Sequence, residues 1–160
     1  MTTTYRIHDL VELLDAVSKI QRSLIIDGRT EYLWFRGQPN AEWKLIPSIQ
    51  RCGLSCEEER YITNDFRIKA NQIMDNPPDR RNYAAWMSIM QHYGIPTRML
   101  DWSRSPLIAA FFAVQSHPTE DACIWALRPG ALNHLEAGED CIYGSDMRTI
   151  DSLLQTAFAS

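Results

Sequence analysis

A short aromatic and polar cluster at residues 34–38 carries the first side chain suited to binding an anion. Arg36 follows an apolar run and directly precedes Gly37. A guanidinium at the end of an apolar strand needs acceptors, because burying it unpaired costs several kcal/mol. Its planar fork suits two-point contact with a phosphate or carboxylate, and Gly37 lets another group approach the backbone closely. Two interpretations stay open: Arg36 binds an anionic ligand, or it forms an internal salt bridge with Asp101.

The second cluster begins at Gln91, His92 and Tyr93, at the expected end of a helix. His92 is a candidate proton carrier or hydrogen-bond donor to a substrate. For a lone histidine the commoner role is to cap the helix, because the exposed carbonyls of a C-terminus stabilise a cation.

Charges and hydroxyls follow at residues 97–103, just before an apolar helix. This order directs Arg98, Asp101 and Ser103 towards a shared location. The N-terminus of the next helix offers free backbone N–H groups to an anion. Arg–Asp ion pairs with a purely structural role would produce the same sequence pattern, so that alternative also stays open. We predict that most of the tryptophans at 34, 43, 86 and 102 lie in the core, with one or two facing a planar base.

Bulk properties exclude several classes of protein. The chain has 160 residues, 45% of them hydrophobic, which is enough for one domain with its own core. The net charge of −4 argues against an extended surface for duplex DNA. Four irregularly spaced cysteines favour reduced, structural thiols in a cytoplasmic protein, and no metal site or membrane span is expected. Walker, Rossmann, HExxH and serine hydrolase motifs are absent from the sequence.

The elements that must position these residues are mostly helices. Apolar spacing and capping residues predict helices over 9–24 with Asp9 as cap, from Ser55 to about 74, over 83–93 ending at Gly94, and over 107–114 after Ser105-Pro106. The last of these is apolar nearly all round and is therefore placed in the core.

Strands are predicted over 31–36, ended by Gly37 and Pro39, and over 122–127, with a shorter extended piece over 43–46. The tail from Gly130 is weakly patterned, although 150–158 is suited to a final helix. These elements indicate a single α+β domain over 1–160 with a small mixed or antiparallel sheet flanked by several helices.

The two clusters, together with residues 43–51, 86–94 and 109–114, resemble the FRG domain family over about residues 30–128. Members of this family are mostly bacterial or phage-borne. The order of the elements is also similar to that of R-S-E type ADP-ribosyltransferases, in which an aromatic-Arg-Gly element on the first core strand helps to hold NAD. On this resemblance Arg36 binds the NAD phosphates or ribose, and Ser103 stands near the Ser-Thr-Ser position.

The sequence also departs from these patterns. The Ser-Thr-Ser motif is absent, and the transferases' late glutamate has no counterpart, because Glu136 and Glu139 are expected in a loop. The late strand of FRG domains is not seen before Ser160, so the chain is expected to be truncated or a short, degenerate form.

The resemblance implies an ADP-ribosyltransferase-like effector of a bacterial or phage defence or toxin system, with NAD as cofactor. The alternative is a non-catalytic regulatory module that binds a nucleotide-like small molecule or a protein such as an antitoxin. The predicted catalytic residues are Arg36, His92 and Ser103. The predicted ligand-binding residues are Phe35, Gly37, Gln38, Gln91, Tyr93, Thr97, Arg98, Asp101 and Trp102.

Overall fold

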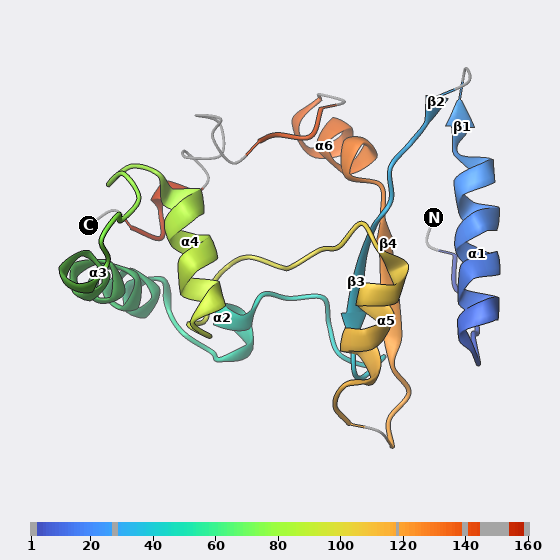
Figure 1. Ribbon diagram of the computed structural model, residues 1–160, viewed down its shortest axis with the longest axis horizontal. Helices are drawn as coiled ribbons and strands as arrows, with labels where there is room; N and C mark the ends of the chain where they lie inside the picture. Colours follow the sequence, from blue (N-terminus) through green and yellow to red (C-terminus); the bar gives the residue numbers. More distant parts are fainter. Residues whose placement is uncertain (1–2, 27–28, 118, 139–140, 145–153, 159–160) are drawn as a thin grey trace. The chain divides into compact units, whose positions relative to one another are not determined.

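The computed structural model describes residues 3–26, 29–117, 119–138, 141–144 and 154–158 (Figure 1). The chain divides into two compact units. One comprises Met1–Lys44 with Asp101–Ile142, and the other comprises Leu45–Leu100 with Tyr143–Ser160. Each unit is described by itself. Among the described residues, no helix combines the length and the apolar character needed to cross a bilayer.

The first unit is built on an antiparallel pair of strands, β3 (Trp34–Gln38) and β4 (Cys123–Leu127). Their register places Arg36 opposite Trp125 and Gly37 opposite Ile124. The unit also holds α1 (Leu10–Ser23), the short hairpin of β1 (Ile25–Ile26) and β2 (Arg29–Thr30), α5 (Pro106–Val114) and α6 (Pro129–Ala137).

One face of the β3–β4 sheet is apolar and covered by helices. Leu33 and Phe35 are buried with Leu13 and Val17 of α1 and Ala109 of α5. Gly37 lies on the same face, where α5 comes so close that an added Cβ would stand 1.8 Å from the carbonyl oxygen of Ala109. Because successive side chains of a strand point to opposite faces, Arg36 and Gln38 must lie on the other face.

The second unit is helical, with α2 (Ser48–Arg51), α3 (Cys56–Ile73) and α4 (Tyr83–His92). Its core consists of buried residues from α3, α4 and the segment 154–158: Ala70, Trp86, Met87, Ala157 and Phe158. The Phe158 ring lies 4.8 Å from that of Tyr83, centroid to centroid. The segment 154–158 is therefore an integral part of this core.

Several sequence predictions are confirmed. The class is α+β with a small antiparallel sheet, and the helix ends follow their caps. Asp9 accepts a hydrogen bond from the Glu12 N–H, and Ser55 forms a complete capping box with Glu58. Gly94 has a φ of +74°, as a glycine that ends a helix often does. The predicted strand over 122–127 is present as β4.

Other predictions are wrong, each for a physical reason. Gly37 lies within β3 rather than ending it, because the strand pairing continues to Gln38. The extended piece over 43–46 is a turn followed by irregular chain, held by the Gln38 side chain. The weakly patterned tail contains α6, which begins at Pro129 and includes Glu136. Ile150 and Leu153 of the predicted last helix, and Glu139, lie outside the described residues.

Two helices bury small or polar residues and leave large apolar ones exposed. On α3 the buried residues are Glu59, Thr63 and Ala70, while the apolar residues Tyr61, Ile68 and Ile73 are exposed. On α5 only the small residues Ala109 and Ala113 are buried. The prediction that α5 is a core helix is therefore wrong for its large side chains.

Candidate functional site

Arg36 projects from the middle of β3. Its Nη1 donates a hydrogen bond to the backbone carbonyl oxygen of Asp101, at 2.9 Å. The side chain of Asp101 is exposed and does not accept this hydrogen bond. Arg36 and Asp101 are thus neighbours, as the sequence indicated, but the contact between them is not the predicted salt bridge.

The sheet face opposite α5 carries five residues with polar or aromatic side chains: Trp34, Arg36, Gln38, Cys123 and Trp125. We call it the polar sheet face. Arg36 and Trp125 are direct cross-strand partners, as are Gln38 and Cys123. Side chains of such partners lie next to each other on one face. The polar sheet face therefore combines a guanidinium, an amide, a thiol and two indoles.

The indole of Trp125 is unusual within this group. Its Nε1 is buried and, among the described residues, makes no regular hydrogen bond. The Cys123 thiol is the polar neighbour that interacts with the indole. Burial raises the pKa of the Cys123 thiol, and the nearby indole partly offsets that effect. Trp125 Nε1 is thus a buried donor beside the Cys123 thiol, and what the indole offers to this face is its ring.

Gln38 has a mainly structural role in this face. Its side chain is buried, and its Nε2 donates to the carbonyl oxygens of Asn40 at 3.2 Å and Trp43 at 2.6 Å. These bonds hold the turn that follows β3. The amide is therefore already engaged, and it fixes one edge of the polar sheet face.

Ser103 lies on the side of β3 away from β4. It exchanges two backbone hydrogen bonds with Phe35, at 2.7 and 2.8 Å, so β3 is bordered on both sides. The Ser103 Oγ accepts from the N–H of Ser105, and the Ser105 Oγ accepts from the N–H of Ile108 in the first turn of α5. The N–H groups of the cap residue Ser105 and of Ile108 thus already have side-chain partners. Trp102, between Asp101 and Ser103, is half-buried.

Gln91 and Thr97 belong to the second unit and bind each other. The Thr97 hydroxyl donates to Gln91 Oε1 at 2.9 Å, and Thr97 is 1% exposed. Ser48 Oγ accepts from the Thr97 N–H at 3.0 Å and donates to the Thr97 carbonyl. This network fixes the chain after α4, and Thr97 is well enclosed by it.

His92 and Tyr93 end α4 with their side chains exposed. Their rings meet edge to face with centroids 5.3 Å apart. Tyr93 also lies 6.2 Å from the ring of Phe66 on α3. Both residues are accessible, and their contacts are with aromatic neighbours.

Arg98 binds a residue that the sequence did not single out. Its Nε and Nη2 donate to the two carboxylate oxygens of Glu59, and its Nη1 donates to the Thr156 hydroxyl at 2.6 Å. The hydrogen bonds to Glu59 raise the pKa of Arg98. By its position in the sequence, Glu59 is one of three acids in the first turn of α3, where the helix dipole favours them. Glu59, Thr63 and Ala70 are spaced so that they lie on one side of the helix, and this spacing could have indicated that Glu59 is buried.

The structure thus sorts the predicted residues into two sets. The first unit holds Phe35, Arg36, Gly37, Gln38, Asp101, Trp102 and Ser103, and the second holds Gln91, His92, Tyr93, Thr97 and Arg98. Sequence reasoning missed Trp125 and Cys123, which enter the site only through the strand register. Within the described ranges, no three side chains of the kinds that bind metals are grouped.

Comparison with known proteins identifies one relationship. No curated protein and no solved structure matches the chain significantly. The sequence model of the FRG domain matches residues 31–122, which is more than half of the 160 residues. This range contains Arg36 and all the other predicted site residues. The chain belongs to the FRG domain family.

Proposed function

We propose that the polar sheet face binds NAD or a related nucleotide, with Arg36 contacting its phosphate groups. The observation that carries this proposal is the direct pairing of Arg36 with Trp125 across β3 and β4. A guanidinium suits a phosphate, and an adjacent indole ring suits a planar base. The Asp101 carbonyl oxygen accepts a hydrogen bond from Nη1 and so helps to orient the guanidinium.

The reaction we propose for this site is transfer of ADP-ribose, in line with the resemblance to R-S-E type transferases. The bond between C1′ of the nicotinamide ribose and the pyridinium nitrogen breaks, and its electron pair leaves with nicotinamide. A nucleophile of the acceptor forms the new bond to C1′ and releases its proton to solvent. Arg36 would hold the phosphates during this step. An effector role in a defence or toxin system is part of the same proposal.

A second candidate function is nucleotide binding without turnover, in a regulatory module. One observation favours it: the described residues of the polar sheet face include no carboxylate. Glu136, which had been considered for the late glutamate, is an exposed residue of α6. The two candidates share the ligand and differ only in whether nicotinamide is released.

Calorimetric titration of NAD and of ADP-ribose into the wild type tests the shared step. Arg36→Gln should weaken binding by about tenfold or more, because charge-assisted phosphate contacts are among the strong hydrogen bonds. Arg104→Gln is the matched control, since Arg104 is an exposed arginine of the same unit that lies over the Tyr32 ring. Circular dichroism establishes that each variant is folded.

Absence of binding to the folded wild type at millimolar ligand would refute the proposal, as would equal binding by Arg36→Gln. Nicotinamide release, measured on the wild type with and without a bacterial lysate as acceptor, then separates the transferase from the binding module.

A further inference from the structure

The outer face of α5 is a continuous apolar surface. Leu107, Ile108, Phe111, Phe112 and Val114 are 48%, 50%, 59%, 54% and 69% exposed. At 100° per residue, these five side chains span an arc of about 160° on one side of the helix. Single exposed apolar residues are ordinary on a protein surface, but five adjacent ones on one helix mark an interaction site.

The inner face of α5 explains why the outer face is left open. Ala109 and Ala113 allow the helix to lie directly on the backbone of β3 at Gly37. The small side chains therefore face the sheet, and the large ones point away from it. Among the described residues, neither Phe111 nor Phe112 belongs to the core cluster of the first unit.

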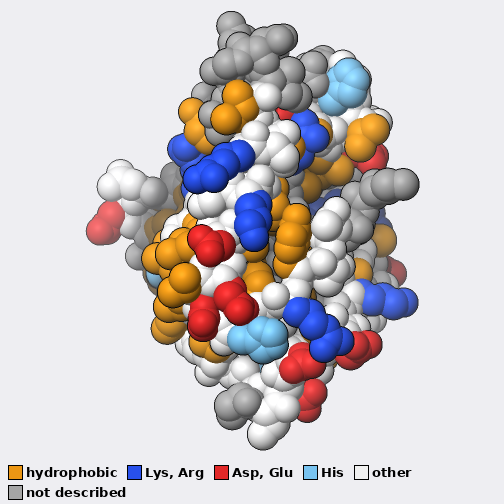
Figure 2. Space-filling model, turned by 90° about the vertical axis from the view of Figure 1, so that its right-hand side faces the viewer, with side chains coloured by type: hydrophobic (Ala, Val, Ile, Leu, Met, Phe, Trp, Pro, Cys, Tyr) orange, Lys and Arg blue, Asp and Glu red, His pale blue; other side chains and the backbone are white. Residues whose placement is uncertain are grey.

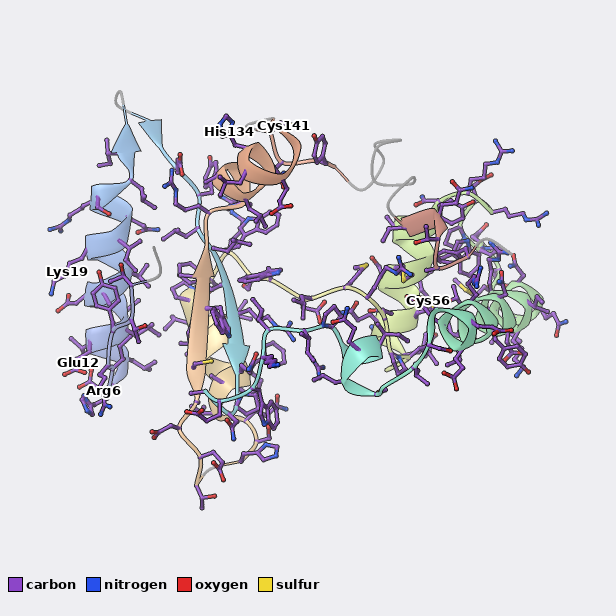
Figure 3. All side chains as sticks on the ribbon, turned by 180° about the vertical axis from the view of Figure 1, so that it is seen from behind. Arg6, Glu12, Lys19, Cys56, His134 and Cys141 are labelled. Carbon is purple, nitrogen blue, oxygen red and sulfur yellow. The ribbon has the colours of Figure 1, made fainter. Side chains whose placement is uncertain are left out.

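The apolar residues exposed on α1 are mixed with charged ones. α1 exposes Leu10, Val11 and Leu14, but its outer surface also carries Glu12 and Lys19, which project away from the sheet (Figure 3). On the side of the molecule where α1 lies, hydrophobic side chains are interspersed with acidic and basic ones (Figure 2). All nine residues of α5 are uncharged.

We propose that the outer face of α5 binds the same face of a second copy of the chain. Two-fold symmetry brings identical patches together, and no like charges meet between two uncharged helices. From the exposed fractions, full coverage would bury about 600 Å² on each copy and about 1,200 Å² in total, at the lower end of specific interfaces. An interface of that size fits a reversible dimer.

The charges at the two ends of α5 favour an antiparallel pair. Arg104 precedes the helix, and the exposed acids Glu120 and Asp121 follow it. Antiparallel packing places the Arg104 end of one helix beside the acidic end of the other, and it also aligns the two helix dipoles favourably. A membrane surface is a poorer occupant, because leaflets that carry anionic lipid repel these acids and a chain of net charge −4.

Sedimentation velocity over a range from about 1 to 300 µM tests this proposal. We expect a concentration-dependent monomer–dimer equilibrium for the wild type. Phe111→Glu should raise the dissociation constant by about tenfold or more, because it buries two carboxylates at the centre of the pair. The control is Leu135→Glu, which places the same charge at a residue of α6 that is 80% exposed and should leave the equilibrium unchanged.

A wild type that stays monomeric throughout the range would overturn the proposal. So would a folded Phe111→Glu variant whose dissociation constant is unchanged. If Phe111→Glu does not fold, Leu107→Glu decides the question in the same way, since an acid in the first turn of a helix is compatible with the helix dipole. Nucleotide titration of the same variants is independent, because Phe111 and Leu107 are not on the polar sheet face.

Discussion

Arg98 holds Glu59 through both oxygens of its carboxylate, with Nε donating to Oε1 at 2.8 Å and Nη2 donating to Oε2. The side chain of Glu59 is 6% exposed and that of Arg98 is 27% exposed. A buried carboxylate is tolerated only when its hydrogen bonds are satisfied, and this two-point contact satisfies them. The pair fixes α3 to the segment that follows α4, inside the second unit.

Glu59→Gln should lower the free energy of unfolding by about 2–4 kcal/mol, because it leaves the partly buried Arg98 without its countercharge. Urea denaturation followed by circular dichroism measures the change. Asp65→Asn is the matched control on the same helix, since the Lys69–Asp65 pair is 70% and 40% exposed. That control should change stability by less than about 0.5 kcal/mol. Equal effects of the two substitutions would show that the Arg98–Glu59 pair is not buried.

The capping box of α3 predicts a pH dependence. Hydrogen bonds from the Ser55 backbone and side chain lower the pKa of Glu58 below its ordinary value of 4.5. Since the folded pKa is lower than the unfolded one, the stabilisation is fully present above pH 4.5 and is lost as the pH falls through the folded pKa. Thermal melts from pH 7 to pH 3 should show Ser55→Ala less stable than the wild type at pH 7, with the difference shrinking in acid. A difference that stays constant over this range would contradict the assignment.

The backbone of β3 and α5 meets too closely for a side chain at Gly37. A Cβ there would stand 1.8 Å from the Ala109 carbonyl oxygen and 2.7 Å from the Ala113 backbone nitrogen, so no rotamer can relieve the clash. We expect Gly37→Ala to destabilise the protein by about 3 kcal/mol or more. Gly53→Ala is the control, because its φ is +67° and no atom lies within 4 Å of the added Cβ. It should cost about 1 kcal/mol, from backbone strain alone. A Gly37→Ala variant as stable as this control would show that α5 does not lie on β3.

The ends of the helices could be predicted from the sequence because capping is local. Asp9, Ser55 and Ser105 each accept a hydrogen bond from an N–H three residues later, as their positions indicated. The buried side of a helix depends instead on what packs against it. Ala109 and Ala113 face the sheet because Gly37 admits them, and no periodicity within α5 reveals that Gly37 is opposite.

The candidate site was predictable only in part for the same reason. Arg36 is recognisable from its neighbours in sequence, whereas Trp125 joins it through pairing between strands 89 residues apart. The partner of Arg98 was also missed, because Glu59 is explained equally well as a helix-start acid. Residues brought together by distant pairing leave no local pattern.

The backbone and the side chain of Asp101 have different roles in the site. Its carbonyl oxygen accepts the Arg36 hydrogen bond, and its side chain is exposed. Asp101→Ala keeps the carbonyl, so it should change the free energy of unfolding by less than about 0.5 kcal/mol, as surface substitutions usually do. Nucleotide affinity should also stay within about twofold of the wild type, in contrast to Arg36→Gln, because the guanidinium keeps its orientation. Chemical denaturation and calorimetric titration measure the two quantities. A loss of stability above about 2 kcal/mol would mean that the carboxylate is buried against a cation, which the geometry of Arg36 does not support.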